Sequence, residues 1–246
     1  MDRLENLKNI IMYLMADEHV SHQIPSSLEE RQRMMRALMN VWEPRSIAED
    51  FLMKQDVELQ MQREDKGVVK VHGEGLTIWQ GDITRLKVEA IVNAANAQAL
   101  GCWAPLHNCI DNCIHSAAGI QLRKECADKM QGRLLATGDA FITQGYDLPA
   151  RHVIHTVGPI IPDGVPTKEQ EEQLAQCYRS CLDLAEQNGL ESIAFCCIST
   201  GVFHFPNELA ARIAIETVKS YPRHALKTIV FNVFLDKDRD IYQQLL

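Results

Sequence analysis

The sequence has few aromatic residues, no long apolar run and no clustered basic stretch. Of its 246 residues 6% are aromatic, 46% hydrophobic and 24% charged. Without an apolar run near 18 residues, no membrane helix is expected. The net charge of -8, with no clustered Lys or Arg, argues against broad binding to nucleic acid or anionic membranes. Collagen, low complexity and disorder are also excluded. We therefore expect a soluble globular protein, in which a local anion site of backbone amides stays open.

The start of the chain, MDRLENLKNI, also lacks a basic region leading into an apolar stretch. Eight cysteines could otherwise indicate disulfides. We expect reduced cysteines and a cytoplasmic protein.

Residues 1–65 are expected to form a helical N-terminal extension. Apolar residues recur there at helical spacing, which predicts three helices. Ser27 with Glu30, and Ser46 with Glu49, have the spacing of capping boxes. The methionines between them fit core packing better than the alternative of a promiscuous binding groove.

Residues 66–246 are expected to form an α/β domain, a layered sheet with helices on its faces. Short β-branched runs alternate there with helical patterns, and no internal repeat occurs. The expected strands are VVKVH, LTIWQ, VEAIVN, ATGDAFIT, HVIHTV, SIAFCCIS and KTIVFNVF. The expected helices are Asn108–Met130, Lys168–Asn188, Asn207–Tyr221 and a short one after Asp236.

The stretch LGCWAPLHNCIDN carries Cys102, His107 and Cys109 within eight positions. Two thiolates and an imidazole suit Zn²⁺, and three ligands without a fourth are typical of catalytic rather than structural zinc sites. The alternative is that the cysteines are small buried hydrophobes and the histidine a satisfied core residue.

Small and amide side chains follow three of the expected strands, where ligands of open α/β sheets bind. Asp82 could accept a nucleobase amine, and Asn93 and Asn96 could hold sugar hydroxyls. A turn of backbone N–H groups could bind phosphate; it comprises Ser199, Thr200, Gly201, Val202 and Phe203. Each signal alone is weak, because Asp82 could equally be a cap and the asparagines turn formers.

Five segments together resemble the macrodomains, which bind ADP-ribose. They are WQGDIT at Trp79, VEAIVNAAN at Val88, CIHSAAG at Cys113, ATGDAFITQGYDLPARHVIHTVGP at Ala136 and SIAFCCISTGVFHFP at Ser192. The resemblance implies a three-layer macrodomain with a mixed central sheet. It also implies adenine recognition by Asp82 and the Ile83 amide, distal-ribose contacts from Asn93 and Asn96, and diphosphate along Ser199–Phe203.

The chain departs from most macrodomains where they have a run of glycines, because it has CWAPLHNC there. This segment, with the helical extension, resembles the zinc-dependent macrodomains of bacteria and other microbes. Their C-x4-H-x-C loop matches Cys102, His107 and Cys109, and Cys113 is a spare candidate. His204 also departs from the glycine common at its position, and its side chain could narrow the site or point outward.

The resemblance implies a zinc-dependent hydrolase that removes mono-ADP-ribose from protein side chains. IDNCIH resembles the VDGCIH of hydrolytic macrodomains, so Asp111 is expected to activate water or orient the ribose; the alternative is a helix N-terminal charge. Zinc in such a site could polarise an oxygen or lower the pKa of a bound water. A lipoylated carrier resembling the glycine-cleavage H protein, modified by a sirtuin-type transferase, is the implied partner. A non-catalytic ADP-ribose reader with a structural zinc and a metal-tied interaction scaffold remain the alternatives.

Overall fold

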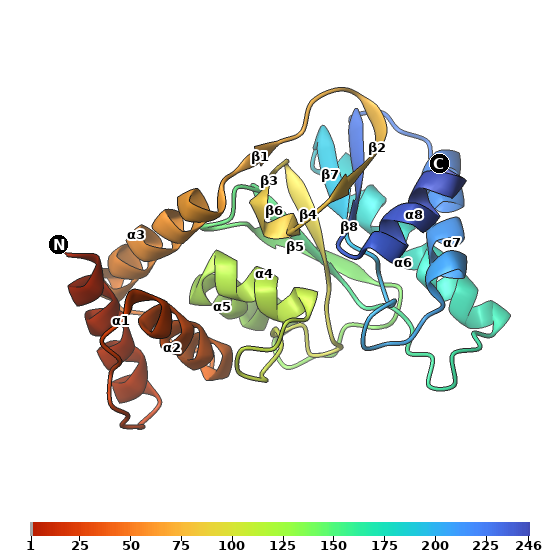
Figure 1. The fold of residues 1–246 in the computed structure, drawn as a ribbon. Helices are drawn as coiled ribbons and strands as arrows, with labels where there is room; N and C mark the ends of the chain where they lie inside the picture. Colours follow the sequence, from red (N-terminus) through yellow and green to blue (C-terminus); the bar gives the residue numbers. More distant parts are fainter. Residues whose placement is uncertain (1) are drawn as a thin grey trace.

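The computed structural model describes residues 2–246, and it places a helical cluster beside an α/β sandwich (Figure 1). The cluster consists of α1 (Arg3–Asp17), α2 (Leu28–Val41) and α3 (Glu49–Lys66). The three predicted N-terminal helices are thus confirmed.

The first predicted capping box is confirmed as an N-cap, and the second is wrong. The Ser27 hydroxyl accepts a hydrogen bond from the Glu30 N–H at 3.3 Å, which satisfies one of the free donors at the start of α2. In α3 the N-cap is Ala48, which has no side chain acceptor. Ser46 lies two residues before that cap and cannot serve the first turn.

A mixed six-stranded sheet forms the centre of the sandwich, in the order β2-β8-β7-β4-β6-β5. All neighbours are parallel except β5 and β6, which pair antiparallel. The strands are β2 (Gly75–Gln80), β4 (Ala90–Ala94), β5 (Ala140–Gln144), β6 (His152–Thr156), β7 (Ser192–Phe195) and β8 (Thr228–Val233). Two short strands, β1 (Val69–Lys70) and β3 (Leu86–Lys87), pair separately.

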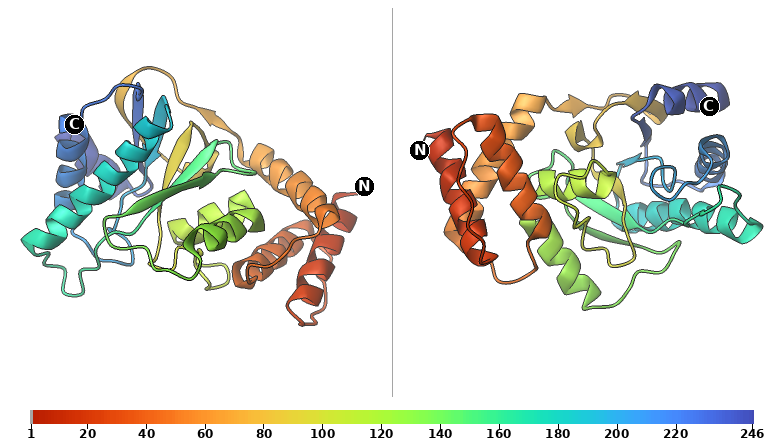
Figure 2. Two further views of the ribbon diagram at one scale, coloured as in Figure 1. Left: turned by 180° about the vertical axis from the view of Figure 1, so that it is seen from behind. Right: turned by 60° about the horizontal axis from the view of Figure 1, so that its bottom comes forward.

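Helices flank both faces of this sheet, which confirms the predicted three-layer α/β fold (Figures 1 and 2). They are α4 (Ile110–Ala118) and α5 (Ile120–Met130) toward the N-terminal helices, and α6 (Lys168–Gln187), α7 (Asn207–Ser220) and α8 (Asp236–Leu245) on the other side. No helix within residues 2–246 is long and apolar enough to cross a membrane.

The single helix predicted over Asn108–Met130 is wrong, because Gly119 divides it into α4 and α5. Gly119 has a φ of 96°, a value that a residue with a Cβ rarely adopts. A Cβ there would also lie 2.6 Å from Nε2 of Gln55, so α3 approaches the break closely.

Two apolar clusters stabilise the fold. The larger lies between the sheet and its helices, and the smaller joins α1, α2 and α3 around Trp42 and Phe51. Ile120 of α5 is buried in the smaller cluster and is its sole member from beyond α3 among the described residues. The predicted boundary between 1–65 and 66–246 falls in the last turn of α3 and stays a prediction.

Candidate functional site

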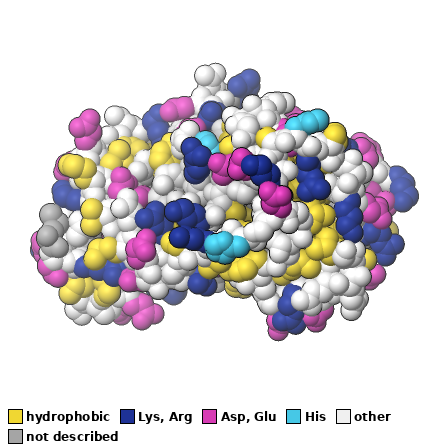
Figure 3. Space-filling model, turned by 90° about the horizontal axis from the view of Figure 1, so that it is seen from above, with side chains coloured by type: hydrophobic (Ala, Val, Ile, Leu, Met, Phe, Trp, Pro, Cys, Tyr) yellow, Lys and Arg dark blue, Asp and Glu magenta, His cyan; other side chains and the backbone are white. Residues whose placement is uncertain are grey.

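The candidate residues gather where β2, β4 and β7 end. Because these strands run parallel, their carboxyl ends meet at one edge of the sheet. The loops after β4 and β7 lie at the lower edge of Figure 1 and come forward in the right view of Figure 2. Figure 3 shows side chains of both charges intermingled over the opposite, upper face.

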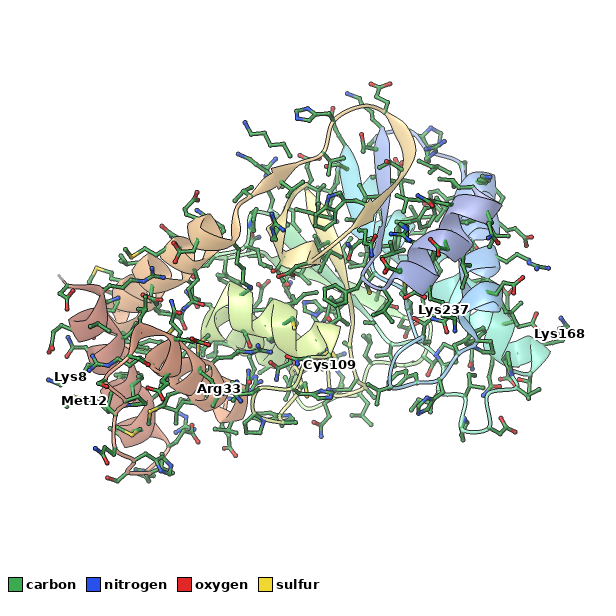
Figure 4. All side chains as sticks on the ribbon, viewed as in Figure 1. Lys8, Met12, Arg33, Cys109, Lys168 and Lys237 are labelled. Carbon is green, nitrogen blue, oxygen red and sulfur yellow. The ribbon has the colours of Figure 1, made fainter. Side chains whose placement is uncertain are left out.

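The three predicted zinc ligands lie together in the loop between β4 and α4. Their ligand atoms all fall within 4.8 Å of one another, and Sγ of Cys102 lies 3.5 Å from Nδ1 of His107. Two ligands of a tetrahedral zinc, one sulfur and one nitrogen, stand roughly 3.6 Å apart, given bonds of about 2.3 and 2.0 Å. The donor set and this separation therefore fit a zinc site. Figure 4 labels Cys109 at the start of α4.

Two features of the loop bring these ligands together. Cys109 is the N-cap of α4, and its Sγ accepts from the Asn112 N–H at 3.5 Å. Gly101 has a φ of 81°, and a Cβ there would lie 2.8 Å from the His115 ring. A glycine is therefore required just before Cys102. Burial raises the pKa of the Cys109 thiol to about 12.

Asp111 binds both predicted asparagines. Nδ2 of Asn93 donates to Oδ1 of Asp111 at 2.8 Å, and Nδ2 of Asn96 contacts Oδ2 at 3.4 Å. Asn96 also donates to the Gly101 carbonyl at 3.1 Å, which ties this group to the ligand loop. The Asp111 charge also acts on the Cys109 thiol, so the carboxylate and the ligand set occupy one corner of the site.

Burial dominates the electrostatics of this corner. It raises the pKa of Asp111 to about 6, against the opposing effect of the Asn93 hydrogen bond and of Arg123. It lowers the pKa of His115 well below the usual value, so this ring is neutral. It also lowers the pKa of Arg123 to about 10, which leaves that guanidinium charged at neutral pH.

His155 on β6 sets the orientation of the Asn93 amide. The Thr143 hydroxyl donates to the Val153 carbonyl at 3.3 Å, so it accepts from Nε2 of His155 at 3.0 Å. Nδ1 of His155 is then bare and accepts from Nδ2 of Asn93 at 3.1 Å. Oδ1 of Asn93 is buried without a partner among the described residues, and it remains free to accept from a ligand hydroxyl.

His155, His115 and Cys126 form a second group whose side chains could hold a metal. The three are buried, and His155 contacts Asn93 and Thr143. Burial lowers the pKa of His155 to about 3, so it stays neutral. The sequence reasoning missed His155 and Thr143, since a histidine and a threonine within strands carry no local signal. A possible signal was the alternation of β6, which places His155 on the same side as Val153 and Val157.

Asp82 serves as a helix cap, which was the alternative to adenine recognition for this residue. Its Oδ1 accepts from the Thr84 N–H at 3.0 Å and from the Thr84 hydroxyl at 2.6 Å, at the start of the short helix η1 (Ile83–Arg85). Its Oδ2 lies 3.5 Å from Nζ of Lys66, and a third of the side chain is exposed. The carboxylate can therefore cap η1 with one oxygen and accept from a ligand with the other.

The segment Ser199–Phe203 forms a turn that presents backbone N–H groups. Those of Gly201, Val202 and Phe203 donate to no acceptor within the described part of the chain. The Ser199 hydroxyl is buried without a partner there, next to Gly158. Such a turn can bind an anion, and the phosphate site expected there stays a prediction.

His204 follows this turn with its side chain exposed. Its φ of 58° lies in the left-handed region, which explains why a glycine is common at this position.

The fold and the strand-end site define the class of protein. The Macro domain family matches residues 92–214, and full-length relatives agree. The chain belongs to the macrodomain family.

The similar proteins are named more specifically. The chain is 44% identical over 259 residues to the "Protein-ADP-ribose hydrolase" of Staphylococcus aureus strain MSSA476, covering 99% of this chain and 97% of that protein. It is 47% identical to the protein of the same name from Treponema medium, covering 96% of each. A solved structure of an Oceanobacillus iheyensis macrodomain variant with ADPR superposes with a TM-score of 0.63 at 39% identity, covering 71% of this chain and 92% of that one.

Proposed function

We propose that the protein is a zinc-dependent protein-ADP-ribose hydrolase that removes mono-ADP-ribose from modified protein side chains. One observation carries the proposal: the Asn93–Asp111–Asn96 group is tied to the loop of Cys102, His107 and Cys109, because Asn96 donates to the Gly101 carbonyl and the Asp111 charge acts on the Cys109 thiol. The relatives named as hydrolases at 44 and 47% identity support it.

The proposed roles at the distal ribose follow from the hydrogen bonds of the site. Asp111 fixes both amides, and His155 directs the Asn93 carbonyl oxygen away from this network. That oxygen has no partner of its own, so we assign it to a ribose hydroxyl. Asp111 then orients the ribose or the attacking water, at the anomeric carbon or at the ester carbonyl that joins it to the protein.

Cys102, His107 and Cys109 would hold the zinc. The fourth coordination position would be left to substrate or water. A zinc ion there supplies Lewis acidity or a water of lowered pKa. Gly101 lets the backbone pass close to the His115 ring directly before the ligand Cys102.

The remaining candidates would bind the rest of ADP-ribose. Oδ2 of Asp82 and the Ile83 N–H, which has no backbone acceptor among residues 2–246, suit an adenine edge. The turn Ser199–Phe203 suits the diphosphate, because its free N–H groups neutralise negative charge without a basic side chain.

The test is release of free ADP-ribose from mono-ADP-ribosylated protein by the zinc-loaded chain. About one zinc per chain is expected, and Cys102→Ala or His107→Ala should remove most of it by elemental analysis. Chelation should abolish release. Full release by the chelated chain would contradict zinc dependence, and stoichiometric zinc in both variants would move the metal elsewhere.

The same experiment separates the alternatives. A reader with a structural zinc would bind ADP-ribose tightly but release no free ADP-ribose from the modified protein. A fourth protein ligand on the zinc would indicate an interaction scaffold. A lipoylated carrier and an acidic acceptor side chain stay predictions of the family resemblance. Comparing a lipoylated carrier with an unrelated protein, each ADP-ribosylated on Glu or Asp, tests the carrier, and comparing carriers modified on Glu and on Arg tests the acceptor side chain.

A further inference from the structure

The loop that carries the zinc ligands is held from outside the α/β sandwich, by side chains of α2. Residues 101–109 contain no helix or strand. Their backbone polar groups therefore need other partners to hold one conformation.

Asn40 and Arg36 of α2 provide two of these partners. Oδ1 of Asn40 accepts from the Leu106 N–H at 2.9 Å, and Nη2 of Arg36 donates to the His107 carbonyl at 2.8 Å. The two residues are one helical turn apart and project from the same face of α2. They therefore bind the backbone of the ligand His107 and of Leu106 directly before it.

Asn112 and Arg123 extend this support to the other half of the loop. Nδ2 of Asn112 donates to the Ala104 carbonyl at 2.9 Å, and its Oδ1 accepts from Nη2 of Arg36 at 2.9 Å. Nη2 of Arg123 contacts the Cys102 carbonyl at 3.4 Å, while its Nη1 donates to the Asn40 carbonyl at 2.8 Å. Both residues thus connect the loop to α2.

An adjacent face of α2 anchors the helix. Met35, Leu38 and Met39 are buried in the cluster that α1, α2 and α3 share. Arg36 and Asn40 are therefore presented from a packed element and not from a free helix. Asn40 is 1% exposed, so a loop N–H that lost it would lie next to a buried gap.

We propose that the N-terminal helices form part of the metal site, because Arg36 and Asn40 of α2 hold the ligand loop in position. The inference rests on the proposed zinc site and assigns a purpose to the extension. Side chains that orient metal ligands from behind usually change affinity about 10- to 100-fold when removed. Arg36 and Asn40 are positioning residues, because they contact the loop and not the metal.

The test compares Arg36→Ala and Asn40→Ala with Arg33→Ala, a matched control. Arg33, labelled in Figure 4, lies exposed on the same helix and makes no hydrogen bond or ion pair with another described residue. Each protein is titrated with zinc against a chelator. We expect about 10- to 100-fold weaker zinc binding in the first two variants and unchanged binding in the control. Arg36→Lys keeps the charge but loses the two-pronged contact, and it should fall between.

Hydrogen exchange of the metal-free proteins tests the loop independently of zinc. The amides of residues 102–107 should exchange faster in Arg36→Ala and Asn40→Ala than in wild type and Arg33→Ala. Lower melting temperatures with unchanged zinc affinity and exchange would overturn the inference, as would equal weakening in Arg33→Ala. If Arg36→Ala does not fold, Arg36→Lys and Asn40→Ala decide. Wild-type protein that binds no zinc would contradict the proposed metal site, and exchange alone would then decide how the loop is held.

Discussion

At the scale of single residues, the burial and the contacts of Asp111 allow its effect on the reaction rate to be measured apart from zinc binding. It is 5% exposed, and it contacts both asparagines but none of the three ligand side chains directly. Its removal should therefore alter the reacting end of the substrate more than the metal.

We expect Asp111→Ala to slow single-turnover release of ADP-ribose by about 10² to 10⁴, the usual range for a positioned acid or base. Zinc content should stay at the wild-type level, and ADP-ribose affinity should fall less than the rate. Single-turnover rates, elemental analysis and calorimetry measure the three quantities. Wild-type rates in this variant would leave Asp111 as a charge at the start of α4.

Asp82 allows a finer substitution because its two oxygens have different partners. Asp82→Asn keeps the oxygen that caps η1 but replaces the other with an amide, which cannot accept from an adenine amine. We expect ADP-ribose affinity about 5- to 150-fold lower, from the loss of about 1 to 3 kcal/mol. The melting temperature and zinc content should not change. Affinity equal to wild type would remove the carboxylate from adenine recognition.

At the scale of elements, α3 packs against a buried carboxyl of the sandwich, that of Asp147 between β5 and β6. Oδ1 of Asp147 accepts from Nε2 of Gln60 at 3.2 Å, and its carbonyl accepts from Arg63 at 3.2 Å. Burial, assisted by the neighbouring Asp56, raises the pKa of Asp147 to about 7. An unfolded aspartate has a pKa of about 3.9. The folded state therefore holds this proton more tightly than the unfolded state does.

The sign of the pH effect follows. The stability that Asp147 contributes is fully present below about pH 3.9 and is lost as the pH rises through about 7. Asp147→Asn should accordingly gain melting temperature relative to wild type as the pH is raised from 5 to 8. Glu74→Gln, in an exposed loop, should show a constant difference. Scanning calorimetry at the two pH values decides it; a constant difference in Asp147→Asn as well would contradict the raised pKa.

Local patterns predicted most of the elements. Helical spacing gave the three N-terminal helices, and β-branched runs gave the six strands of the main sheet. The break at Gly119 was missed, because a glycine within an apolar helical pattern does not reveal that Gln55 of α3 approaches it.

The candidate site divides in the same way. Cys102, His107 and Cys109 lie close in sequence, so their meeting in space could be predicted. Arg36 and Asn40 lie 66 to 71 positions from their loop partners. Such contacts depend on tertiary packing and leave no mark in local composition.

At the scale of the whole molecule, Ile120 joins the sandwich to the helical cluster. It is 2% exposed, and its N–H donates to Oε1 of Gln55 at 3.1 Å. We expect Ile120→Ala to lower the free energy of unfolding by about 2 to 5 kcal/mol, from lost burial and the cavity left behind. Met53→Ala on α3, where the side chain is 64% exposed, should change it by less than about 0.5 kcal/mol. Denaturant titration measures both, and equal effects would mean that Ile120 does not connect the two clusters.

The contact between α2 and the ligand loop also bears on how the chain is made. Domains usually fold from the N-terminal side as the ribosome extends the chain. Here α2 is synthesised well before the loop, whose contacts with it lie 66 to 71 residues further on. Ile120, which completes the helical cluster, follows directly after α4. We therefore expect part of the apolar surface of α1, α2 and α3 to stay exposed until Ile120 has been synthesised. The stretch 101–120 then covers that surface with Ile120 and brings the three ligands to α2.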